Sequence, residues 1–217
     1  MNMCFSAEVS FVAAAALLIT GSAMIKNFVS RNYFCVTLIP LLFGLQQFSE
    51  GVLWTHLNSG SPPNIFSYLA ERAYLFFAFF IWPVWIPLSL ATIEKINWRR
   101  NLLYFILACG VTLSLTNLYF AFHSAVNVNI IQHSLQYQGT LPPQTFLYPS
   151  TVVLPIFISS VRNVWIFGAL ISVAYALTAY LYEETFVSVW CFFAAIVSLI
   201  LYKVLRDDQQ VIDAEKA

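Results

Sequence analysis

Seven apolar stretches, separated by short polar gaps, follow one another along almost the whole chain. A helix that crosses a membrane needs about 20 mostly apolar residues at a rise of about 1.5 Å each, and most of these stretches approach or exceed that length. The pattern predicts an all-α protein, a bundle of seven transmembrane helices. The expected spans cover residues 5–25, 33–57, 66–93, 101–122, 146–161, 163–182 and 185–204.

Two of the expected spans contain a pair of prolines each, and prolines lack a backbone amide donor and kink helices. Pro83 and Pro87 fall inside the third span, and Pro149 and Pro155 fall inside the short fifth span. Short or proline-interrupted spans often line binding sites in transporters. We therefore expect these two spans to border any site that the bundle contains.

The longest gap, between the fourth and fifth spans, has an amphipathic pattern of its own. Val128, Ile131 and Leu135 recur at helical spacing, with polar residues between them. This spacing predicts a short interfacial helix or lid, which Gly139 and Pro142–Pro143 would end.

Basic residues mark alternate gaps, and this fixes an orientation. Lysine and arginine are enriched in cytoplasmic loops of membrane proteins, so the basic gaps predict an N-terminus outside, a C-terminus inside, a membrane domain over 1–205 and a cytoplasmic tail over 206–217. Nine of the ten Lys and Arg residues follow the pattern: Lys26, Arg31, Lys95, Arg99, Arg100, Arg162, Lys203, Arg206 and Lys216.

The composition supports the membrane interpretation. Of 217 residues, 60% are hydrophobic and 9% are charged, whereas about 25% of residues in soluble domains are charged. The formal net charge is zero, so nothing favours nucleic-acid binding, and the expected partner is the lipid bilayer. The first stretch is followed rather than preceded by basic residues, which indicates a retained helix instead of a cleaved signal peptide.

Arg72 is the exception to the charge pattern, because it lies beside Glu71 inside the third span. Glu50 lies at a similar depth in the second span, about 10 Å from the outer end. Adjacent antiparallel helices would bring Glu50 and Arg72 together. We therefore predict an ion pair between them, with Glu71 as the competing partner.

Other polar side chains share this depth. Gln46, Glu50 and Trp54 recur every four residues and so lie on one stripe of the second span, with Gln47 beside it. Polar groups inside spans usually face the bundle interior or a wet cavity. The alternative is a structural hydrogen-bond network that fixes helix packing. The candidate binding residues are Glu50, Arg72, Gln46, Gln47, Glu71, Trp54, Ser6, Cys4, Asn117, Trp190 and Cys191, and Ser188 shares their depth.

Metal and cofactor chemistry has little support in the sequence. His56, His123 and His133 all fall on the expected outer side, where zinc binding with Glu50 or Glu71 would be the hypothesis to consider. They lack HxxxH and HExxH spacing, so we predict no metal site. The four cysteines show no metal-ligand spacing, and there is no P-loop, GxSxG or dinucleotide motif. We expect no cofactor.

Three motifs resemble an uncharacterised family of bacterial multi-pass membrane proteins. They are Met3-Cys4-Phe5-Ser6-Ala7, Gly44-Leu45-Gln46-Gln47-Phe48-Ser49-Glu50-Gly51 and Ser188-Val189-Trp190-Cys191-Phe192-Phe193-Ala194-Ala195. The resemblance covers nearly the whole chain and implies a bacterial inner (plasma) membrane location, but no activity. Because family chains begin at the Met-Cys pair, the start is either Met1 or Met3.

The candidate site leaves several functions open. The leading hypothesis is binding of a small polar solute or lipid headgroup in an outward-facing intramembrane pocket, as in a transporter or sensor. The alternative is a membrane-embedded lipid hydrolase, possibly metal-dependent, with Glu50 as base and Cys4, Ser6 or Cys191 as nucleophile. A third is an interaction subunit whose partners meet the tail from Arg206 to Gln210. The ligand and the oligomeric state stay open.

Overall fold

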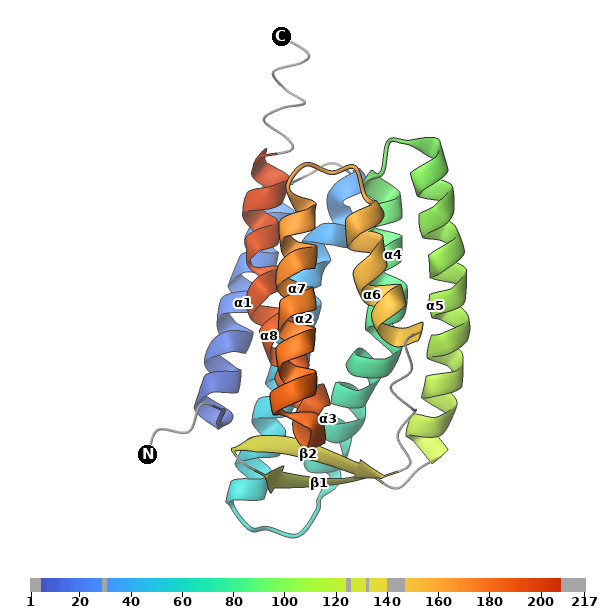
Figure 1. Cartoon of the computed structure of the whole chain (residues 1–217). Coiled ribbons are helices and arrows are strands. Elements are labelled where there is room, and N and C mark those ends of the chain that lie inside the picture. The colour runs from blue at the N-terminus through green and yellow to red at the C-terminus, as the bar shows by residue number, and fades with distance from the viewer. Residues whose placement is uncertain (1–4, 29–30, 124–125, 132, 140–146, 208–217) are drawn as a thin grey trace.

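The computed structural model describes residues 5–28, 31–123, 126–131, 133–139 and 147–207. It is an all-α bundle with one small β-hairpin (Figure 1). The helices are α1 (Ala7–Asn27), α2 (Phe34–Asn58), α3 (Ile65–Phe76), α4 (Trp82–Ile93), α5 (Asn97–His123), α6 (Leu147–Ile158), α7 (Val164–Leu181) and α8 (Phe186–Ser198). Short 3-10 turns cover Arg31–Tyr33 and Glu183–Thr185.

Six helical segments in the described part of the chain are long and apolar enough to cross a membrane: Ala7–Asn27, Phe34–Asn58, Ile65–Ile93, Asn97–Phe120, Val164–Leu181 and Glu183–Asp207. They indicate a multi-pass membrane protein. Helix α6 differs, because its 12 residues extend only about 18 Å, less than the hydrocarbon thickness of about 30 Å.

The bundle has two distinct ends, which Figure 1 shows at the bottom and the top. The hairpin lies across the lower end, here called the hairpin end, where α1 begins. The upper end carries the α4–α5 and α6–α7 connections and is called the Glu94 end, after the acidic residue between α4 and α5. Helix α8 runs to this end, and α6 lies in the half of the bundle nearest to it.

The third apolar stretch is one helical unit with a defect. Helices α3 and α4 are joined by a π-helical segment, Phe77–Ile81. Because Pro87 has no amide hydrogen, the Pro83 carbonyl loses its intrahelical donor, and Gly110 of α5 packs directly against this carbonyl. The Ser114 hydroxyl of α5 donates to the Phe80 carbonyl at 3.0 Å. Helix α5 therefore covers the backbone groups that the irregular segment leaves exposed.

The predicted helix in the longest gap is wrong. Strand β1 (Val126–Ile131) pairs with antiparallel strand β2 (Ser134–Gly139). Hydrophobic residues at 126, 128 and 130 alternate with asparagines, and this period of two favours a strand over the helical spacing. His133 supplies the turn with φ 62°. Gly139, which was expected to end a helix, is instead the last residue of β2, and Pro142–Pro143 lie outside the described residues.

At the opposite end, a buried carboxylate ties α4 to the α6–α7 connection. Glu94 is 3% exposed, and its Oε1 atom accepts from the Ile96 amide at 2.9 Å and from the Ser160 hydroxyl at 2.5 Å. Its Oε2 atom accepts from the Ser160 amide at 2.6 Å. Arg99 reinforces the junction through a 3.1 Å bond from Nη1 to the Ile158 carbonyl. Sequence analysis missed Glu94, because it stands beside Lys95 in a charged gap.

These bonds predict a pH-dependent contribution to stability. Burial raises the pKa of Glu94, but hydrogen bonds from Ser160 and Ile96 outweigh it and hold the pKa below its ordinary value. The stabilisation is therefore present above the unfolded-state pKa of about 4.3 and is lost as the pH falls through the lower folded-state pKa. We expect Glu94→Gln to cost about 1–3 kcal/mol at pH 7 and to flatten the acid side of a thermal-unfolding profile. Exposed Glu184→Gln is the control, and equal profiles for the two variants would contradict the prediction.

Candidate functional site

The polar stripe of α2 faces the interior of the bundle near the hairpin end. Gln46, Gln47, Glu50 and Trp54 are each 2% exposed or less. Gly51 belongs to the same turn, and a side chain there would meet the ring of Phe11 on α1. The glycine lets α1 close one side of α2 while the polar stripe faces the helices on the other side.

Glu50 is paired differently from the prediction. Its carboxylate accepts a short hydrogen bond from the Ser188 hydroxyl of α8. Arg72 instead lies against Glu71, with 3.6 Å between Nε and Oε1, so the competing partner holds it and the predicted Glu50–Arg72 ion pair is wrong. The prediction rested on a similar expected depth for both charges, and depth does not fix the direction in which a helix presents a side chain.

Gln46 connects the stripe to α4. The Trp82 indole donates from Nε1 to Gln46 Oε1 at 2.8 Å, and the Trp82 ring stacks on Phe43 with centroids 3.7 Å apart. On α8, the Cys191 thiol lies beside the Gln46 amide and the Tyr74 hydroxyl. The second, third and last apolar stretches therefore meet at one polar cluster.

Three tyrosines complete the site, and sequence analysis singled out none of them. The Tyr74 hydroxyl of α3 donates to the Val187 carbonyl of α8 at 3.2 Å, and its ring stacks on Tyr137 of the hairpin at 4.9 Å between centroids. The Tyr148 hydroxyl donates to the Ala78 carbonyl in the π-helical segment. Tyrosines are frequent in this chain, with 11 in all, so no local spacing distinguished these three.

Several buried polar atoms of this cluster have no hydrogen-bond partner within the described residues. They are Gln46 Nε2, both polar atoms of the Gln47 amide, Tyr137 Oη and Trp190 Nε1. Burial raises the pKa of Tyr137 well above its ordinary range, and the nearby Glu50 adds to the effect, so this hydroxyl stays protonated. Orphaned buried polar groups cost about 1–3 kcal/mol each. The cluster thus offers donors and an acceptor to a polar molecule.

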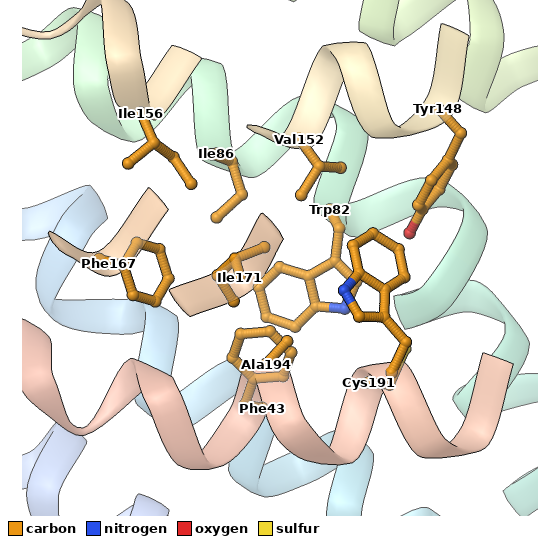
Figure 2. A pocket seen from close by; sticks show the side chains of 11 residues that line it. Phe43, Trp82, Ile86, Tyr148, Val152, Ile156, Phe167, Ile171, Cys191 and Ala194 are labelled. Carbon is orange, nitrogen blue, oxygen red and sulfur yellow. The ribbon is translucent and has the colours of Figure 1, made fainter. Parts of the chain in front are cut away.

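An aromatic cavity adjoins the polar cluster. Figure 2 shows labelled side chains from α2, α4, α6, α7 and α8 converging on it. The centre of a water molecule can occupy a volume of about 20 Å³ inside it, so the cavity holds little more than one water. Trp82 and Cys191 belong to both the cavity wall and the polar cluster. The remaining lining is Phe43, Ile86, Tyr148, Val152, Ile156, Phe167, Ile171, Trp190 and Ala194.

Three further residues predicted for the site are Ser6, Asn117 and Cys4. Ser6 caps α1 through a 3.4 Å bond from the Val9 amide. Asn117 is buried on α5, whose main helical neighbours are α3, α4 and α6. Cys4 lies outside the described residues.

The histidines do not gather with acidic residues. His123 is exposed, stacks on Tyr119 at 4.3 Å between centroids and bonds to the carbonyl of that residue. His133 is exposed at the hairpin turn, and His56 is half-buried near the end of α2. Within the described ranges, no three His, Cys, Asp or Glu side chains form a group that could hold a metal ion.

Comparison with known proteins gives one match. The model of a family of unknown function, DUF6629, matches residues 3–216. No curated protein and no solved structure matches the chain.

Proposed function

Because the chain belongs to the DUF6629 family, whose function is unknown, we propose a function from the site itself. The protein is a membrane receptor or transporter that binds a polar solute or a lipid headgroup at the cluster around Glu50. The observation that carries this proposal is the set of buried amide atoms on Gln46 and Gln47 that lack hydrogen-bond partners within the described residues, on the same helix stripe as the buried Glu50 carboxylate.

The proposal includes a seven-span topology in a bacterial plasma membrane, with the N-terminus outside. Tyr137 stacks on Tyr74 at the hairpin end, whereas Ser160 bonds to Glu94 at the other end. The chain therefore changes ends between residues 139 and 160, which supports counting α6 as part of the fifth crossing. Lys95 and the other basic gaps favour a cytoplasmic position for the Glu94 end by the positive-inside rule.

The chemistry of the cluster suits a ligand with both acceptors and donors. Trp190 Nε1 and the Gln47 amide nitrogen can donate to a carbonyl, phosphate or hydroxyl oxygen. The Glu50 carboxylate accepts a bond from Ser188 and lies beside the Gln47 side chain, and its two oxygens keep further acceptor capacity for a ligand hydroxyl or amine. Since no ion pair within the described residues neutralises Glu50, a cationic or hydrogen-bond-donating group on the ligand would stabilise it.

The test is retention of a bound molecule by purified protein. We expect the wild-type protein, purified from its own membranes, to carry a small molecule detectable by mass spectrometry after extraction. Glu50→Gln should reduce its occupancy about tenfold or more, since hydrogen bonds to charged groups contribute about 1.5–3 kcal/mol. Exposed Glu8→Gln should retain it. Equal recovery from all three proteins, or recovery of nothing from any of them, would contradict the proposal.

One observation favours a second candidate, the lipid hydrolase. The hydrogen bond from Ser188 to Glu50 pairs a hydroxyl with a carboxylate that can serve as its base, as in nucleophilic catalysis. Lipid turnover by wild-type protein that disappears in Ser188→Ala would favour the hydrolase over the binding protein.

A further inference from the structure

We infer that the ligand of this site is a membrane lipid with an acyl chain, which enters sideways from the bilayer between α6 and α7. The inference rests on the proposed function and narrows its ligand class. Three observations carry it: the closed aqueous side of the polar cluster, a cleft at mid-height between α6 and α7, and an aromatic wall that the cleft shares with the inner cavity.

The direct route from water is closed by the hairpin. Leu135 is fully buried and Tyr137 is 7% exposed, and β2 packs on α8 and on the turn before it. The stacked rings of Tyr74 and Tyr137 are nearly parallel, at 6°. A water-soluble ligand would have to lift this hairpin before it could reach Glu50.

The lateral route has an opening of its own. A cleft lies between α6 and α7, and the centre of a water molecule can occupy about 220 Å³ of it. It is lined by Pro149, Ser150, Val153, Leu154, Ser172 and Tyr175. Ser172 stands in the middle of α7 (Val164–Leu181), so the cleft opens at the mid-height of a spanning helix. Leu154 on its rim is 50% exposed. At this height the surroundings of the bundle are hydrocarbon, and the molecules available there are lipids.

One aromatic layer separates the cleft from the cavity. Tyr175 lines the cleft and meets Trp190 edge to face, with centroids 5.3 Å apart. Trp190 lines the inner cavity and also contacts Tyr148, at 5.7 Å. Both rings are side chains whose rotation would join cleft and cavity without moving a helix backbone.

The two compartments match the two parts of an amphiphile. The cavity wall is apolar apart from Tyr148, Cys191 and the two indoles, which suits an acyl chain. The unpartnered donors of Gln46 and Gln47 lie at the polar cluster, where the headgroup would bind, and the unpartnered Trp190 indole lies in the cavity wall. Tyr175 and Trp190 together form an aromatic gate between cleft and cavity. While the two rings are in contact the gate is closed, and the small volume of the cavity belongs to this closed state.

The test uses a phospholipid with a photoactivatable diazirine on its acyl chain, in phosphatidylethanolamine and phosphatidylglycerol vesicles that contain the full-length protein. After illumination, peptide mass spectrometry locates the adducts. We expect adducts on the buried residues Val152 and Trp190, in addition to those on exposed perimeter residues such as Leu177. Adducts confined to the perimeter would overturn the inference.

A matched pair of variants tests the route. Ser172→Trp plugs the cleft, whereas Val173→Trp places the same indole side chain at the neighbouring residue, which is 56% exposed. We expect Ser172→Trp to lose the adducts on Val152 and Trp190 and to keep those on the perimeter, which also reports that the bundle is folded. Val173→Trp should label like the wild type. Identical labelling of both variants would overturn the lateral route.

The outcomes separate this inference from the proposed function. Recovery of a Glu50-dependent ligand that is water-soluble and lacks an acyl chain would leave the proposed function standing and overturn the inference. Adducts in the cavity together with a recovered lipid that does not depend on Glu50 would support lateral entry and reject the proposed binding role of the polar cluster.

Discussion

Gly110→Ala is expected to force α5 away from α4 and to destabilise the folded protein by about 1–3 kcal/mol or more. A methyl group at Gly110 would lie 2.1 Å from the Pro83 carbonyl oxygen and 2.9 Å from the carbonyl carbon. Both atoms belong to the backbone, so no side-chain rotation relieves the clash. The carbonyl itself is available for this close approach because Pro87, four residues later, has no amide hydrogen to occupy it.

The measurement is the thermal unfolding midpoint of purified protein in one detergent. Ala108→Leu is the matched control, because residue 108 is on the exposed side of the same helix and added bulk there projects outward. We expect this control to unfold like the wild type. If Gly110→Ala unfolds at the wild-type temperature as well, the packing of α5 on the proline-interrupted segment is not as tight as described.

Leu135→Asp is expected to open the polar cluster to water. Leu135 is fully buried under the hairpin, and a carboxylate is costly to bury without a partner, so the strand should lift from the bundle. Cys191, 4% exposed in the closed structure, then becomes reachable from the hairpin end. We expect its modification by a membrane-impermeant thiol reagent to rise from almost none to near completion.

The experiment requires that Cys191 be the only cysteine, so Cys4, Cys35 and Cys109 are replaced by alanine. Ile130→Asp is the control, because Ile130 faces Leu135 in the strand register and is 39% exposed. The carboxylate that Ile130→Asp introduces can stay in water without moving the hairpin. Equal modification rates in the two variants would show that the hairpin does not close the site.

Apolar stretches and charge patterning were sufficient to place the helices but not to orient them. A helix occurs in each of the seven expected ranges, since long apolar runs bounded by polar gaps have few other solutions in a membrane. The rotation of each helix about its axis depends on packing. This is why Glu50 and Arg72 were paired wrongly, and why Ser188 was not recognised as the partner of Glu50.

The hairpin and the Glu94 junction depend on contacts between distant segments. Hydrophobic positions of 126–135 fit both a helical and an alternating pattern, and the packing of Leu135 and Tyr137 against the bundle favours the strand. The bond between Glu94 and Ser160 joins residues 66 positions apart. No local pattern in one sequence could link the two.

The length of α6 has a consequence for how the protein is made. A segment of 12 residues is too short to enter the hydrocarbon core as an independent span, whereas α7 and the helix over 183–207 are long enough to do so. Helix α6 packs on α4 and α5, which precede it in the chain, and on α7, which follows it, so we expect it to enter the bilayer together with these neighbours and not alone. The bonds between Ser160 and Glu94 tie the end of α6 to the end of α4, and we expect them to form once α6 has packed against that helix.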